Sequence, residues 1–86
     1  MATNTAYGTV MDDSTGKTVA KSVVKAECGS TTQSTTTDDD GYFEFDNLPA
    51  TTCTFVLAQE WYSITGFTIV PNDGGGDVIT TSDGDL

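Results

Sequence analysis

Two pairs of closely spaced carboxylates are the first side chains in this sequence that could do chemistry. Asp12 and Asp13 are adjacent, and Asp38 and Asp40 are separated by one residue. Two carboxyl groups can cleave a glycosidic bond when an apolar environment raises the pKa of one, so that it donates a proton while the other stays ionised. Both pairs instead lie in Asp-, Ser- and Gly-rich stretches that are typical of solvated tight turns. We therefore predict turns at both places and no catalytic residue.

Histidine is absent from the sequence. The imidazole ring is the most frequent general base and the most frequent metal ligand in proteins. Its absence leaves Ser/His/Asp hydrolysis and zinc binding without their usual residues. We therefore expect a protein that is not an enzyme and that has no cofactor.

Calcium is the one ion that the acidic loops are suited to hold, because Asp-rich loops with Gly supply hard oxygen ligands. Aligned with an EF-hand loop, however, the acidic stretch before Gly41 has Thr36 at the first position and Asn47 at the twelfth. The two strongest ligands of such a loop are then missing. We expect ordinary acidic turns, and the calcium candidates to be examined are Asp38, Asp40, Asp73 and Asp77.

The two cysteines, Cys28 and Cys53, lie at the end of one predicted strand and the start of another, both on the inward-facing side. Antiparallel pairing of these strands would bring them close together. A disulfide that closes a loop of about 25 residues would stabilise the fold by roughly 3 kcal/mol. Two reduced, buried thiols acting as small apolar residues fit the same pattern in a cytosolic protein. The sequence leaves both alternatives open.

Four aromatic side chains are candidates for an interface, because Tyr and Trp combine a large apolar surface with a polar group. Tyr7 and Tyr42 fall on predicted outward faces of strands. Trp61 is expected instead to cap one end of the core. The interface candidates are Tyr7, Tyr42, Trp61 and Tyr62.

The length and net charge of the chain limit the number of domains and the kinds of partner. The chain has 86 residues, enough for a single domain, with a core at about residues 6–81 and polar ends at 1–5 and 82–86. Its net charge is −10, with three lysines and no arginine. Such a surface repels phosphate backbones and anionic membranes, so we expect neither nucleic acid nor a membrane as partner.

Turn signals recur at the spacing typical of an all-β sandwich, and no stretch has the apolar period of a helix longer than one turn. Thr31–Thr37 has β propensity without an apolar face and is predicted as an exposed edge strand. The seven predicted strands cover residues 6–11, 22–28, 31–37, 42–45, 52–58, 62–70 and 77–81.

Two motifs resemble the carboxypeptidase regulatory-like domains, which are transthyretin-like β-sandwiches. Residues 8–16 (GTVMDDSTG) are similar to the opening strand and turn of that family, and residues 37–49 (TDDDGYFEFDNLP) to its central hairpin. The resemblance implies a seven-stranded antiparallel sandwich, transthyretin-like or Ig-like, and an accessory module without catalytic residues. The sequence departs from the family at Cys53, where an aromatic residue is usual, and in the Thr that replaces the Gly before this strand.

A structural or interaction role follows from these expectations. The start Met, the lack of an export signal and the acidity favour a virion component, such as a capsid or tail decoration protein of a bacterial or archaeal virus. Its partner would be the protein shell or further copies of itself, docked through the Thr31–Thr37 edge, the loop at residues 74–76 or the tyrosines. The alternative is an extracellular or cell-surface module that binds proteins or carbohydrates, excised from a larger protein.

Overall fold

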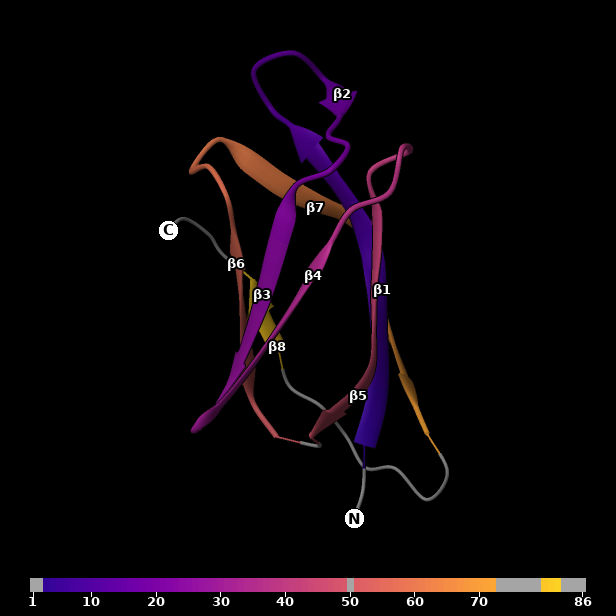
Figure 1. Cartoon of the computed structure of the whole chain (residues 1–86), viewed down its shortest axis with the longest axis vertical. Helices are drawn as coiled ribbons and strands as arrows, with labels where there is room; N and C mark the ends of the chain where they lie inside the picture. The colour runs from indigo at the N-terminus through magenta and orange to yellow at the C-terminus, as the bar shows by residue number, and fades with distance from the viewer. Residues whose placement is uncertain (1–2, 50, 73–79, 83–86) are drawn as a thin grey trace.

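The chain folds into a β-sandwich, shown by a computed structural model that describes residues 3–49, 51–72 and 80–82 (Figure 1). The described residues contain no helix, and hence none that could cross a lipid bilayer. The strands are β1 (Thr3–Asp12), β2 (Lys17–Thr18), β3 (Val23–Cys28), β4 (Thr31–Thr36), β5 (Tyr42–Pro49), β6 (Cys53–Leu57), β7 (Tyr62–Pro71) and β8 (Thr80–Ser82).

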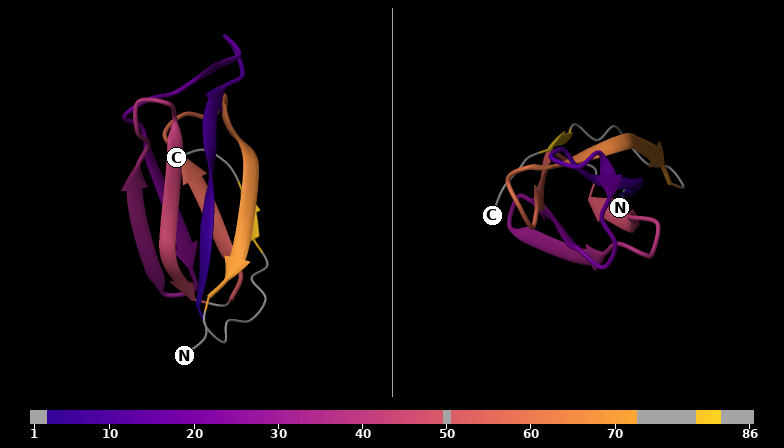
Figure 2. Two further views of the ribbon diagram at one scale, coloured as in Figure 1. Left: turned by 90° about the vertical axis from the view of Figure 1, so that its right-hand side faces the viewer. Right: turned by 90° about the horizontal axis from the view of Figure 1, so that it is seen from above.

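The first sheet is built around β1, which pairs antiparallel with β5 on one side and with β7 on the other. The short strand β2 pairs with the last two residues of β1. In the second sheet the strand order is β4-β3-β6-β8. The two sheets face each other across one core, as the views from the side and from above show (Figure 2).

The predicted all-β sandwich is confirmed, with two differences in detail. The first is β2, which the prediction lacked because two polar residues carry no apolar pattern. The second is β8, which pairs parallel with β6, so the sandwich is not purely antiparallel. β6 and β8 are connected through β7, a strand of the opposite sheet. The chain therefore re-enters the second sheet in the same direction as β6. Of the strand predicted at 77–81, residues 77–79 lie outside the described residues.

Alternate residues of the strands point inward, as predicted, and form one hydrophobic core. Side chains of both sheets meet there: Phe45 of β5 packs against Phe55 of β6, with ring centroids 5.8 Å apart. Phe67 of β7 packs edge-on against Phe55 at 5.0 Å. The buried cluster consists of Ala6, Val10, Val24, Ala26, Cys28, Phe43, Phe45, Leu48, Cys53, Phe55 and Leu57.

The first sheet contains two register shifts, one between β1 and β5 and one between β1 and β7. The second shift lies opposite Gly8, between Tyr7 and Thr9. There Gly66 adopts a positive φ of 67°, the conformation in which a Gly bulge admits one extra residue. A Cβ at Gly8 would lie 2.9 Å from Cγ2 of Ile64, so this position of β1 has no room for a side chain.

Two polar residues that were expected to be exposed are buried. β1 begins at Thr3, earlier than predicted, and Asn4 in its second position is completely buried. Thr37 was placed in the exposed edge strand, but β4 ends at Thr36 and Thr37 is 2% exposed. Its hydroxyl donates to the carbonyl of Val19 at 2.7 Å and accepts from the amide of Ser22 at 2.8 Å. Thr37 is therefore buried because it holds the connection between β2 and β3.

Candidate interaction surface

The tyrosine pair lies on the outer face of the first sheet. Tyr7 stands opposite Glu44 of β5 and Thr68 of β7, and Tyr42 stands opposite Thr9. The ring centroids of Tyr7 and Tyr42 are 6.0 Å apart, with the planes tilted by 40°. The hydroxyl of Tyr42 donates to Oε1 of Glu44 at 3.3 Å. Two aromatic rings and one carboxylate thus share a patch of sheet, which we call the tyrosine face (Tyr7, Tyr42 and Glu44).

The tyrosine face is accessible in the described part of the structure. Tyr42 is 37% exposed, Glu44 is exposed and Tyr7 is half-buried. Val70 of β7, paired with Thr5 of β1, adds an apolar side chain that is 45% exposed on the same side. Because much of this surface is apolar and aromatic, removing water from it on binding costs little free energy. The one charged group, Glu44, can provide specificity.

Two effects raise the pKa of the Tyr42 phenol above its ordinary value of 10.0. The larger is partial burial against the sheet. The second is the negative charge of Glu44, which also accepts a hydrogen bond from the phenol hydroxyl. Both disfavour the phenolate. Tyr42 therefore remains a neutral hydrogen-bond donor under physiological conditions.

Trp61 does not cap the core, contrary to the prediction. Its side chain is 46% exposed, in the turn between β6 and β7. Its carbonyl accepts a hydrogen bond from the amide of Asp13 at 2.9 Å, which fixes the turn against the loop after β1. The neighbouring Tyr62, by contrast, is among the partly buried residues that pack against the core. The sequence did not reveal this, because Trp61 lies in a turn, where strand alternation does not indicate whether a side chain points inward.

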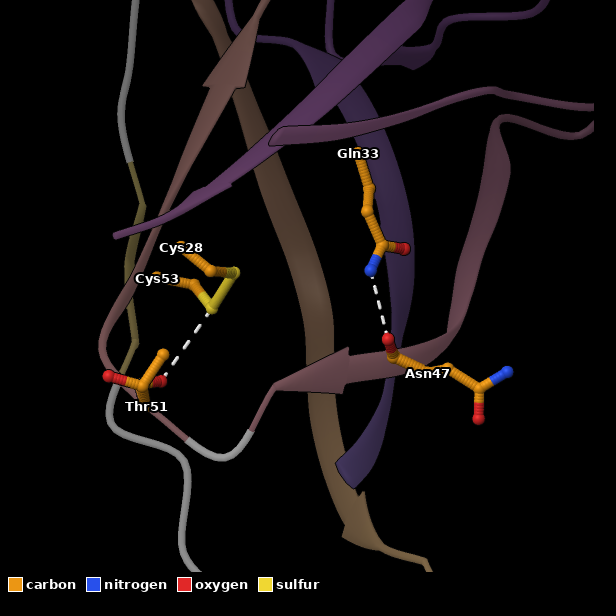
Figure 3. Close-up of a disulfide and its surroundings, with 5 residues drawn as sticks. All are labelled: Cys28, Gln33, Asn47, Thr51 and Cys53. Atoms are coloured by element: carbon orange, nitrogen blue, oxygen red, sulfur yellow. Dashed lines mark hydrogen bonds between the residues drawn. A yellow bond between two sulfur atoms is a disulfide. The ribbon is translucent and has the colours of Figure 1, made fainter. Parts of the chain in front are cut away.

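The two cysteines are joined in a disulfide, with an S–S distance of 2.03 Å (Figure 3). The register of β3 and β6 pairs Glu27 with Thr54, which places Cys28 and Cys53 directly opposite each other one step further. Their Cα atoms are 4.2 Å apart. Of the two alternatives that the sequence left open, the structure shows the oxidised one.

A side-chain hydrogen bond joins the two sheets near this disulfide. Nε2 of Gln33, on β4, donates to the carbonyl of Asn47, on β5, at 2.9 Å (Figure 3). β4 is the edge of its sheet, as predicted, and every residue in it is uncharged.

The carboxylates of the predicted turns act on their own backbone. Oδ1 of Asp38 accepts from the amides of Asp40 and Tyr42 at 2.8 and 2.9 Å. Oδ1 of Asp12 accepts from the amide and the hydroxyl of Ser14 at 2.8 and 2.6 Å. Hydrogen bonds to the ionised form hold the pKa of each carboxyl below its ordinary value, led by the Tyr42 amide for Asp38 and the Ser14 hydroxyl for Asp12.

Asp12 and Asp38, one member of each carboxylate pair, are held in their ionised forms, so neither is suited to donate a proton as a general acid. Within residues 3–49 and 51–72, no three potential metal-ligating side chains come together. The calcium candidates Asp38 and Asp40 lie in a turn that already uses Asp38 as an acceptor. Asp73, Asp77 and the loop at residues 74–76 lie outside the described residues.

Glu44 is the member of the tyrosine face that was not among the interface candidates predicted from the sequence. Its position two residues after Tyr42 placed both on one side of a strand, which is a signal that sequence alone contains. Its position opposite Tyr7 depends on the register between β1 and β5, which a bulge shifts. Pairing across strands far apart in sequence was therefore needed to complete the site.

A family model of the carboxypeptidase regulatory-like domain matches residues 5–82 of the chain. The match covers most of the 86 residues, so the chain belongs to this family, and the resemblance noted in its motifs is confirmed. Comparison with curated proteins and with solved structures gave no match. The family is a regulatory, non-catalytic type of domain.

Proposed function

From the membership of the chain in the carboxypeptidase regulatory-like family, we propose that it is a non-catalytic attachment domain. It docks onto a larger protein assembly through the tyrosine face. The observation that carries this proposal is the patch itself: Tyr7 and Tyr42 lie side by side on a sheet surface with Glu44, without any role in the core. Aromatic residues so placed are typical of binding hot spots.

The first assembly to test is the shell of a virus particle, a capsid or a tail. A compact acidic sandwich suits the outside of such a shell, because its charge keeps it soluble and away from nucleic acid and anionic lipid. The Cys28–Cys53 disulfide favours a protein that functions in an oxidising environment, and the surface of a released virion is such an environment.

A cell-surface or secreted module is the second candidate. The disulfide supports it equally, because such bonds persist in extracellular proteins. A tyrosine pair beside a carboxylate also suits contact with a partner protein or a sugar outside the cell.

Fractionation of the natural source separates the two candidates. Particles released from the culture and intact cell envelopes are purified, and the chain is quantified in each fraction by mass spectrometry against a major shell or envelope protein. The proposal expects a fixed stoichiometry in the particle fraction, or in the envelope fraction for the second candidate. Recovery only as a free monomer, with no binding when the purified chain is added back to either fraction, would overturn both.

A further inference from the structure

The charged side chains on the three long strands of the first sheet, β1, β5 and β7, are all acidic. Glu44 is exposed there, and Asp46 follows on the same strand, also exposed. The three lysines lie elsewhere: in β2, in the connection between β2 and β3, and in β3 of the opposite sheet. We propose that the tyrosine face is a receptor site for an arginine side chain on the surface of the partner protein. This inference rests on the proposed function and names the chemistry of the partner.

Glu44 is available to a cationic partner. In the described part of the chain the ion pair is that of Lys21 with Asp39, which lies in the turn before β5, and Glu44 takes no part in it. Tyr42 donates to Oε1 of Glu44, which leaves Oε2 to accept another donor. A guanidinium group carries five donors in a planar fork, so it can bind the carboxylate while its plane rests on an aromatic ring.

The two rings provide the second half of the site. Their centroids lie 6.0 Å apart and their planes are tilted, so they do not stack face to face and one face of each can remain open. A cation within about 6 Å of a ring centroid is attracted by the ring quadrupole, and arginine makes this contact more often than lysine. The negative charge of Glu44 beside the rings adds to the attraction.

Several other acids of the described chain already have a partner in a hydrogen bond or an ion pair, or lie near a lysine. Asp38 and Asp12 are held by backbone amides of their own turns, and Asp39 is paired with Lys21. On the outer side of the second sheet, Glu27 lies two residues from Lys25, and their strand neighbours there are Thr, Ser and Val residues. An arginine is therefore expected to select the tyrosine face over these acids.

Charge also argues against a second copy of this chain as the occupant. Two chains of net charge −10 that met through this face would bring Glu44 and Asp46 of each copy together without a lysine between them. Like charges brought together at an interface repel each other and disfavour association. A partner that presents a cation removes this penalty.

The test is a titration of the ¹⁵N-labelled chain, followed by amide chemical shifts, with the peptide acetyl-Gly-Arg-Gly-amide. Its control is the same peptide with citrulline, which has nearly the shape of arginine without the charge. We expect the Arg peptide to shift the amides of Tyr7, Tyr42 and Glu44 first, with citrulline at least fivefold weaker. Glu44→Gln should weaken binding of the Arg peptide about five- to tenfold. The matched variant Glu27→Gln should leave the affinity unchanged.

Three results would overturn the inference. Shifts centred on residues 12–13 and 38–40 would show general attraction to acids, and equal binding of the citrulline peptide would show that charge is not recognised. A neutral oligosaccharide, titrated in parallel, that shifted the same residues more strongly would assign the face to a sugar. If the chain binds particles while the Arg peptide does not bind the face, the inference fails and the proposed function stands. If the Arg peptide binds the face but the chain binds neither particles nor envelopes, the proposed function fails and the arginine site stands.

Discussion

The two sheets of the sandwich differ in regularity. In the β4-β3-β6-β8 sheet every strand pair keeps one register, and a disulfide joins β3 to β6. In the first sheet β1 changes register against both of its long neighbours, and Gly8 and Gly66 accommodate the second shift. Among the residues that the structure describes, the buried side-chain polar atoms without a partner, Oδ1 and Nδ2 of Asn4, also belong to β1.

This difference indicates where each sheet contributes. Regular, cross-linked strands stabilise a small fold, whereas bulges redirect side chains and are frequent beside functional sites. The tyrosine face lies on the irregular sheet, next to the shift at Gly8. We therefore regard the second sheet as the scaffold and the first as the sheet shaped for contact.

The largest effect is expected where the regular sheet loses its cross-link. Replacing both cysteines, Cys28→Ser with Cys53→Ser, removes a bond between residues 25 apart in sequence and should lower the free energy of unfolding by about 3 kcal/mol. Urea denaturation with and without a reducing agent measures it. The wild type should fall to the level of the variant on reduction, and an unchanged midpoint would remove the disulfide from the stabilising role given to the second sheet.

Two glycines with positive φ, in turns beside the strands of the first sheet, separate the effect of backbone strain from that of crowding. A Cβ at Gly41, where φ is 84°, would lie 3.0 Å from Cβ of Thr18 and 3.1 Å from the carbonyl oxygen of Val10. Gly16 has a φ of 74° with no atom within 4 Å of such a Cβ. Gly16→Ala should cost about 1 kcal/mol from backbone strain alone, and Gly41→Ala about 2 kcal/mol because crowding is added. Equal urea midpoints for the two variants would contradict the packing of the turn before β5 against β1 and β2.

Replacement of Asn4 tests whether a residue of the first sheet lowers the free energy of unfolding. Both polar atoms of its side chain are buried without a partner, and an unsatisfied group of this kind destabilises a protein by about 1–3 kcal/mol. Asn4→Leu should therefore raise the free energy of unfolding by about 1 kcal/mol, measured by urea denaturation. A loss of stability would mean that a bound water or another group satisfies Asn4 in solution, and Asn4→Ala would then lose stability as well.

The smallest effect is expected from the turn that leads into β5. The pKa of Asp38 is lowered from 3.8 by hydrogen bonds that its carboxylate accepts. A carboxyl group with a lowered folded pKa stabilises the protein above its unfolded pKa, and the contribution is lost as the pH falls through the folded pKa. Asp38→Asn should thus be less stable than the wild type at pH 6, and the difference should shrink as the pH falls below 3.8. A difference that stays constant with pH would contradict the role of the ionised group.

The core of the fold was predictable from the sequence because alternation is a local property. Val24 and Ala26, or Phe43 and Phe45, stand two residues apart, and a strand places both on one side. The burial of Asn4 and Thr37 was not predictable, because it depends on contacts between segments far apart in the chain. Thr37 is buried by its hydrogen bonds to Val19 and Ser22, which a polar, Thr-rich stretch does not reveal.

The candidate site was predictable in its parts but not in its geometry. Tyr7 and Tyr42 were expected on outward faces, and they lie there. Their closeness, and the position of Glu44 opposite Tyr7, depend on the pairing of β1 with β5. Trp61 was misplaced because its turn gave no alternation from which an inward or outward direction could be inferred.

Binding of face variants to the natural assembly tests the central claim most directly. The double variant Tyr7→Ser with Tyr42→Ser is compared with Val23→Ser, which removes an exposed apolar side chain (42% exposed) from the opposite sheet. Each is shown by urea denaturation to be folded and is then sedimented with purified particles or envelopes. We predict that the tyrosine variant loses at least tenfold in affinity while Val23→Ser binds like the wild type. Retention of binding by the tyrosine variant, with loss in Val23→Ser, would place the contact surface on the wrong sheet.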